Sequence, residues 1–313
     1  MSVVNETRNA PRRLRDGMIK SRKTRIGDLT IAFICLLLML LCLLPMLHVL
    51  ASSLSSPEYL VRNEVFIFPK GWNTEAYHTV LTTEKYVRSL GWTAVLTLIC
   101  TLLSITLTIC CAYPLTYTNL RGGKFINIFI LFTMYFSAGT IPSYLVLSRL
   151  GMLNTPYALI FPNCISVFNV IIMRSFFYGV PDSLREAAEI DGAGPIRVLV
   201  QVYLPLSLPV IATLSLFYAV GRWNGFSDAL MYLKDEAAKA KYSPIQLLLY
   251  NLIQVATQKA EQVTQEGSSA TSAGVSKTIQ MATVMFATVP ILIVYPWLQR
   301  YFVAGVTIGA VTG

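Results

Sequence analysis

The stretch from Pro181 to Pro195 reads PDSLREAAEIDGAGP and forms a strongly polar segment between two hydrophobic blocks. Ser183 and Glu186 have the Ser-x-x-Glu spacing of a capping box, which predicts a helix that starts at Ser183. Gly192 is placed to end that helix, because glycine readily adopts the left-handed conformation found after helix C-termini. Pro195 can open the next helix, since a first turn does not need its missing N–H. The segment is therefore predicted to form an isolated helix of about two turns.

This short helix is predicted to have two different faces. The first face carries Leu184, Ala187, Ala188 and Asp191, which fall on one side of a helix because they are spaced at i, i+3, i+4 and i+7. On the other face, Arg185 and Glu189 are spaced to form an ion pair. A helix this short is marginal in water, so it must pack against something. Its small alanine face suits close approach by a partner.

The rest of the chain is strongly apolar. Of its 313 residues 54% are hydrophobic and 13% charged, which is roughly half the charged fraction of a soluble domain. Windows without Asp, Glu, Lys or Arg cover residues 29–57, 89–120, 125–148, 150–173, 198–221 and 278–299. Each is long enough to cross a bilayer, which takes ~20 residues. Buried helices of a large soluble protein are the alternative, but such helices usually keep one polar face.

The sequence thus predicts an all-α membrane protein with six transmembrane helices. We place them at about 29–50, 89–116, 125–148, 157–177, 206–226 and 279–299. Residues 1–28 hold eight basic and three acidic residues, so the positive-inside rule keeps this segment in the cytoplasm. A cleaved signal peptide is the alternative, but the apolar run after it exceeds the usual 7–15 residues. The predicted domains are the basic segment 1–28, a six-span transmembrane domain 29–305 and a cytoplasmic tail 306–313, which leaves both termini inside.

The polar segment then lies in the cytoplasm, between the fourth and fifth spans. The fourth span contains Asn163, Ser166 and Asn169, which either line a translocation pathway or form hydrogen bonds between helices. Arg222 and Trp223, at the outer end of the fifth span, are further pathway candidates. Arg222 either meets a polar substrate or extends its charged end to the membrane surface.

The outer loop 227–278 is predicted to contain an amphipathic surface helix over 242–258 and a flexible tip over 267–274. Six cysteines all fall within predicted spans, where they act as small apolar residues, and no metal site is predicted. The two histidines, His48 and His78, offer no nucleophile–base set, so no catalytic residue is assigned and the chain is not expected to be an enzyme. No basic run interleaves with aromatic residues, so nucleic acid is not an expected partner.

A longer pattern around the polar segment resembles a known family. Glu186-Ala187-Ala188 is followed after three residues by Gly192, and after nine more by Val202, Tyr203 and Leu204-Pro205. This pattern resembles the EAA motif of ABC importer permeases, with Val202 in place of an isoleucine. Residues 139–145, 150–155, 190–193 and 301–306 look like the carbohydrate branch of that family, associated with oligosaccharide uptake. The resemblance covers nearly the whole chain from about residue 29 onward.

The resemblance implies a type I ABC importer permease fold in a bacterial cell membrane, with the motif as a coupling helix that docks on a cytoplasmic ATPase. The implied coupling residues are Ser183, Arg185, Glu186, Ala187, Ala188, Glu189, Asp191, Gly192 and Ala193. The implied partners are two ABC ATPases, a second permease (a paralogue, giving a heterodimer), an extracytoplasmic sugar-binding protein and membrane lipid. No cofactor is expected on this chain, since it has no phosphate-binding loop of the Gly-x-x-x-x-Gly-Lys-Ser/Thr type and the ATPases hydrolyse the ATP.

A stand-alone secondary carrier for a polar solute is the competing interpretation. Carriers normally place ionisable residues deep in their spans and show internal repeats. The charge-free windows and the lack of a visible repeat argue against it.

Overall fold

The computed structural model describes residues 22–117, 120–266 and 270–311, and the regular structure of these residues is helical. The chain divides into two compact units, Met1–His48 and Val49–Gly313. In the described residues, the first unit consists of most of helix α1 (Arg22–Ser53). This helix contains the predicted span 29–50, and its apolar side chains are exposed over almost its whole length, as expected of a helix that lipid surrounds. Most of the predicted basic segment 1–28 lies outside the described residues.

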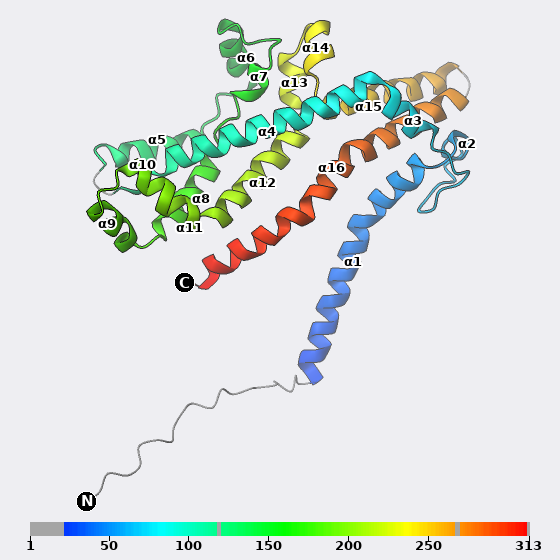
Figure 1. Ribbon diagram of the computed structural model, residues 1–313. Helices are drawn as coiled ribbons and strands as arrows, with labels where there is room; N and C mark the ends of the chain where they lie inside the picture. Colours follow the sequence, from blue (N-terminus) through cyan, green and yellow to red (C-terminus); the bar gives the residue numbers. More distant parts are fainter. Residues whose placement is uncertain (1–21, 118–119, 267–269, 312–313) are drawn as a thin grey trace, which may run out of the picture. The chain divides into compact units, whose positions relative to one another are not determined.

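The second unit is an assembly of helices of very different lengths (Figure 1). In chain order they are α2 (Pro57–Val61), α3 (Glu75–Thr82), α4 (Glu84–Ala112), the 3₁₀ helix η1 (Pro114–Thr116), α5 (Gly123–Tyr135), α6 (Thr140–Arg149), α7 (Tyr157–Ile160), α8 (Val167–Tyr178), α9 (Asp182–Ile190), α10 (Pro195–Val198), the π-helix η2 (Leu199–Tyr203), α11 (Leu204–Leu206), α12 (Leu208–Asn224), α13 (Ser227–Tyr232), α14 (Glu236–Tyr242), α15 (Ile245–Glu266) and α16 (Ala270–Val311).

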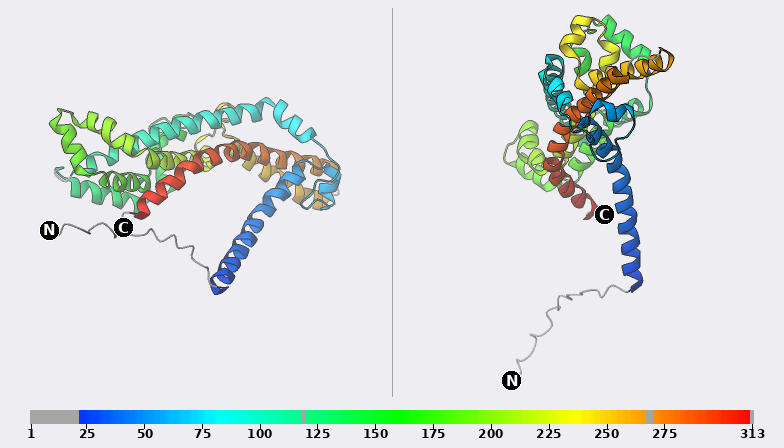
Figure 2. Two further views of the ribbon diagram at one scale, coloured as in Figure 1. Left: turned by 60° about the horizontal axis from the view of Figure 1, so that its bottom comes forward. Right: turned by 90° about the vertical axis from the view of Figure 1, so that its right-hand side faces the viewer.

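Helices α4, α12 and α16 organise this second unit. Helix α12 packs against both α4 and α16, and α4 also packs against α8 (Figures 1 and 2). Helix α16 continues past α12 to contact α15, α3 and α2. Its contact with α2 depends on Gly274, because a Cβ at that position would lie 2.7 Å from the carbonyl oxygen of Pro57. The long helices thus fix the ends of the shorter ones that carry the polar residues.

Three stretches are apolar and long enough to cross a membrane without a break: Gly27–Ser53, Glu84–Thr116 and Gly274–Val294. The predicted continuous span 125–148 is wrong as a single helix, because α5 and α6 meet at an angle of 112°. Residues 136–139 separate the two helices, and Gly139 at the end of this break has a left-handed φ of +87°, which cannot continue an α-helix. Counting each bent pair as one span raises the number of candidates to five. The six-span organisation stays a prediction.

Two other predicted spans are also modified. The span 157–177 is divided into α7 and α8 by the non-helical residues 161–166. The span 206–226 corresponds to α12, which is bent by 83° from the segment Pro195–Leu206 before it. A helix is confirmed over most of the predicted 242–258, but Ile245, Leu247 and Leu248 at its start are buried in the protein.

The predicted flexible tip 267–274 is wrong where it can be checked. Residues 267–269 lie outside the described residues, but 270–274 belong to α16. Its glycine, Gly274, serves close packing against α2, as described above.

Candidate functional site

Helix α9 forms within the predicted polar segment, but it begins one residue earlier than the capping-box pattern indicates. Its first residue is Asp182 and its N-cap is Pro181, without a side-chain cap hydrogen bond. Ser183 is therefore inside the first turn, and the predicted cap is wrong. The acidic side chain of Asp182 occupies the first turn instead, where a negative charge is favoured by the helix dipole.

The predicted end of the helix is confirmed. Gly192 has a φ of +80°, and its N–H donates to the carbonyl of Glu189 over 3.0 Å. The N–H of Ala193 donates to the carbonyl of Ala188 over 2.9 Å, so these backbone groups satisfy the last turn of α9. Pro195 is the first residue of α10, as its position predicts.

The charged face of α9 differs from the prediction. Arg185 pairs with Asp182 over 3.1 Å, not with Glu189, because the guanidinium folds back toward the start of the helix. There it also lies over the ring of Tyr117, 5.3 Å from the ring centroid. Arg185 is thus tied to the rest of this chain and is only partly available to a partner.

The two alanines of the motif face different ways. Ala188 and Ala193 are partly buried and pack against the core of the second unit. Ala187 is exposed, as are the remaining predicted coupling residues Ser183, Glu186, Glu189, Asp191 and Gly192. Leu184, which the sequence places on this helix face, is exposed beside them. Sequence reasoning missed two further exposed apolar side chains, Ile190 and Ile196, of which Ile190 is 87% exposed. Apolar residues in a polar loop are the signal that could have identified them.

An aromatic cluster of Tyr113, Tyr117, Phe177 and Tyr203 lies beneath this segment. The rings of Tyr113 and Tyr203 have centroids 5.2 Å apart, and Phe177 meets both of them edge to face. The Tyr113 hydroxyl donates to the carbonyl of Pro195 and also bonds the Tyr117 hydroxyl. The cluster therefore joins the ends of α4 and α8 to the residues that follow α9.

A cavity of about 540 Å³, here named the polar cavity, opens between α4, α8, α12 and the break after α7. Its polar lining residues are Ser104, Asn163, Ser166, Asn169, Tyr218, Arg222, Ser227 and Asp228. Four of the five predicted pathway residues thus lie around one cavity. Ser166 also has a structural role, because its hydroxyl accepts from the N–H of Asn169 and caps α8.

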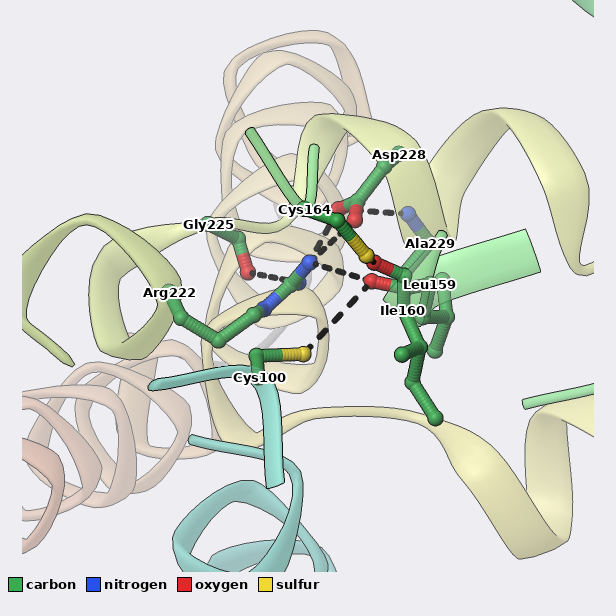
Figure 3. A network of polar contacts seen from close by, with 8 residues as sticks. All are labelled: Cys100, Leu159, Ile160, Cys164, Arg222, Gly225, Asp228 and Ala229. Atoms are coloured by element: carbon green, nitrogen blue, oxygen red, sulfur yellow. Dashed lines mark hydrogen bonds and ion pairs between the residues drawn. The ribbon is translucent and has the colours of Figure 1, made fainter. Parts of the chain in front are cut away.

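Arg222 lines the polar cavity, but its charge is already paired within this chain. The choice between a substrate contact and an extension to the membrane surface stays a prediction. Its guanidinium forms a bidentate ion pair with Asp228, and the side chains are only 8% and 10% exposed (Figure 3). The same guanidinium donates to the carbonyls of Leu159 and Gly225 over 3.1 and 3.2 Å. The pair thus joins α7, the end of α12 and α13 at one edge of the polar cavity.

Trp223 is not part of the polar cavity. Its indole N–H donates to the carbonyl of Ala287 in α16 over 3.1 Å. The side chain lines a separate apolar groove, together with Thr97 and Pro290. Consecutive residues of a helix point in directions about 100° apart, so Arg222 and Trp223 face different surfaces of α12.

This arrangement defines an all-α membrane permease with a polar cavity and a short exposed helix joined to it. Residues 91–308 match the family model described as "Binding-protein-dependent transport system inner membrane component", and the chain belongs to this family. It is a membrane transport permease of the ABC importer type with the type I fold, and not an enzyme. Membership also argues against a stand-alone carrier, because the family depends on a binding protein.

Individual relatives agree over almost the full length. The chain is 38% identical to the "Polygalacturonan/rhamnogalacturonan transport system permease protein YtcP" of Bacillus subtilis (strain 168), covering 93% of this chain and all of the relative. It is 40% identical to "Protein LplC" of the same organism, over 87% of this chain and 90% of that protein. A chain in the crystal structure of a bacterial ABC transporter "involved in the import of the acidic polysaccharide alginate" superposes with a TM-score of 0.79 at 30% identity, covering 90% of this chain and 98% of that chain.

Proposed function

We propose that this chain is one of two permease subunits of an importer for oligosaccharides and forms half of its translocation pathway. The observation that carries the proposal is the polar cavity, which is rich in neutral hydroxyl and amide groups from several helices. Such groups can exchange hydrogen bonds with sugar hydroxyls, and the Arg222–Asp228 pair leaves the lining without net charge. The names of the relatives, which refer to polysaccharide transport, support the same substrate class.

The exposed face of α9 is the proposed docking site for a cytoplasmic ATPase. Glu186 and Ala187 present a charge and a small side chain to the outside, and Leu184 and Ile190 add apolar surface that a groove of the partner would cover. Two ATPase subunits would bind and hydrolyse ATP, and this chain would bind no cofactor. Closure of the ATPases would move α9, and the aromatic cluster would carry that movement to α4 and α8.

The remaining partners follow from this assignment. A second permease, a paralogue, would supply the other half of the pathway, and an extracytoplasmic binding protein would deliver the sugar. The chain would cross the bacterial cell membrane several times, surrounded by lipid, with both termini in the cytoplasm. The excess of basic residues in segment 1–28 supports this orientation.

The test is purification of the tagged chain from its host in a mild detergent, with identification of the proteins that accompany it. The wild type should bring an ATPase and a second permease. Replacement of Glu186 by lysine should remove the ATPase but keep the second permease, because only the α9 face changes sign. The matched control is Glu75→Lys, which reverses an exposed charge at the start of α3 and should keep both partners.

Two results would contradict the proposal. Recovery of the chain alone, in a detergent that preserves related importers, would remove the importer assignment. Loss of the ATPase from the Glu75→Lys sample as well would show that the effect is not specific to α9.

A further inference from the structure

A second cavity of about 540 Å³, here named the basic cavity, lies between the start of α4, the helices α13 and α14, and the start of α15. Four cationic side chains line it, against the single carboxylate of Glu236. The cations are Lys85, Arg88, Lys234 and Lys239. Lys85 and Arg88 come from the start of α4, and Lys234 and Lys239 from a segment about 150 residues later, so the fold brings together two pairs of cations that are far apart in the sequence.

Part of this positive charge has no internal partner. Lys239 pairs with Glu236 over 2.7 Å, and Arg88 makes a longer contact of 3.4 Å with Glu84. Within the residues that the structure describes, Lys85 and Lys234 form no ion pair. The pKa of Glu236 is lowered, first by the hydrogen bond and charge of Lys239 and then by the charge of Lys85. Lys239 and Lys85, which lie on different walls of the cavity, therefore both act on the carboxylate of Glu236.

The walls that carry these charges are held together. The hydroxyl of Thr93 in α4 is buried and accepts a hydrogen bond of 2.9 Å from the N–H of Ile245, the first residue of α15. One residue earlier in α4, the ring of Trp92 packs against the ring of Tyr242. Their centroids are 5.4 Å apart and their planes are inclined by 55°. The junction of α14 and α15 is thus fixed on α4, and a ligand would meet cations that are already placed.

The neutral part of the lining is suited to a sugar. Ser89, Ser243 and Asn251 offer hydrogen-bonding groups, and Leu230, which is 41% exposed, offers an apolar surface for the C–H face of a ring. The volume lies within the range of about 300–1,000 Å³ that is common for small-ligand sites. In contrast to the polar cavity, where Asp228 neutralises Arg222, the basic cavity keeps an excess of positive charge.

We propose that the basic cavity binds the carboxylate groups of an acidic oligosaccharide, with Lys85 and Lys234 as the cations that pair with them. The site would make the first contact with the sugar on its way to the polar cavity. This role rests on the proposed function, which places the start of α4 and the helices α13–α15 on the extracytoplasmic side.

The test measures sugar binding to the complex that co-purifies with the full chain, without added binding protein. The probes are trigalacturonate and maltotriose, which are acidic and neutral sugars of the same length. Trigalacturonate should bind more tightly, and its affinity should fall as salt is raised. The double variant Lys85→Ala/Lys234→Ala should weaken trigalacturonate binding roughly tenfold, because two exposed ion pairs each contribute a modest factor, and should leave maltotriose unchanged.

The matched control is Arg121→Ala/Lys124→Ala, which removes two exposed cations elsewhere and should change nothing. Melting temperatures of both variants should equal that of the wild type, since all four side chains are exposed. Equal binding of the two sugars, or trigalacturonate binding that the lysine variant retains, overturns the proposal. The proposal is also overturned if the lysine variant binds free trigalacturonate normally but no longer binds the extracytoplasmic binding protein. The two lysines would then pair with carboxylates of that protein. Recovery of the ATPase reports on the proposed function separately.

Discussion

The hydroxyl of Tyr113 donates a hydrogen bond of 2.9 Å to the carbonyl oxygen of Pro195, 82 residues further along the chain. Tyr113 lies just after the last residue of α4, and Pro195 opens the helix that follows α9. The same tyrosine ring meets Phe177 and Tyr203 edge to face. A force applied to α9 therefore has a direct route into α4.

Replacement of Tyr113 by phenylalanine should keep the ring contacts and lose the two hydrogen bonds of the hydroxyl, to Pro195 and Tyr117, each worth about 1 kcal/mol. We expect a several-fold lower sugar uptake rate, with the ATPase still bound, because the docking face of α9 is unchanged. The measurement is uptake together with the ATPase rate in proteoliposomes. Tyr135→Phe, at a side chain that is 85% exposed, is the control and should transport normally. Normal uptake by the Tyr113 variant would contradict this role.

Gly192 offers a test of the turn after α9 that involves no steric clash. A Cβ there would meet nothing within 4 Å, but the φ of +80° costs an alanine about 1–2 kcal/mol. Gly192→Ala should therefore lower recovery of the ATPase about tenfold. Gly194→Ala, two residues on, also meets nothing within 4 Å and has a φ of −72°, so it should behave as the wild type. Equal recovery from both variants would count against a strained turn at Gly192.

The ion pair of Arg222 and Asp228 should show strong coupling in a double-mutant cycle. Arg222→Met or Asp228→Leu alone leaves a charge that is about nine-tenths buried, which typically costs about 3–5 kcal/mol. The double variant should recover much of that loss, because neither charge remains. Thermal unfolding of the three variants in detergent measures this. Additive losses would mean that the two charges do not depend on each other.

If sugar passes through the polar cavity, a bulky side chain placed in it should block uptake. Asn163 lines it and is exposed to it, so Asn163→Trp should fill part of its volume and strongly reduce uptake. Asn163→Ala should transport at close to the normal rate, because it removes one polar group without adding bulk. Uptake assays in cells, normalised to the amount of chain in the membrane, distinguish the two. Equal uptake by both variants would place the sugar elsewhere.

The helical class and the polar segment were predictable because their signals are local. Gly192 and Pro195 mark the end of one helix and the start of the next by backbone chemistry alone. The start of α9 was misplaced by one residue, because Asp182 fits the first turn without the cap that Ser183 was expected to provide. The assignment of the exposed residues of α9 to ATPase docking stays a prediction.

Features that depend on tertiary contact were not predictable. Hydropathy shows an unbroken apolar stretch over 125–148, although Gly139 within it turns the chain. Hydropathy did not identify the partner of Arg222 either, because it placed Asp228 in the outer loop 227–278. In the structure α13 brings Asp228 back to the end of α12. Gly274 indicated flexibility in the sequence, but its real role is to let α2 approach α16. The last two cases are contacts that local composition does not encode.

The short separation of Arg222 and Asp228, which are six positions apart in the chain, also matters for biogenesis. A ribosome makes both side chains almost together, so their charges can neutralise each other while the chain is still being inserted. An unpaired arginine at the end of an apolar segment would favour the aqueous side of the translocon until a partner arrived. The pair that joins α7, α12 and α13 in the mature protein can thus also help the segment that contains α12 to be accepted as a membrane helix.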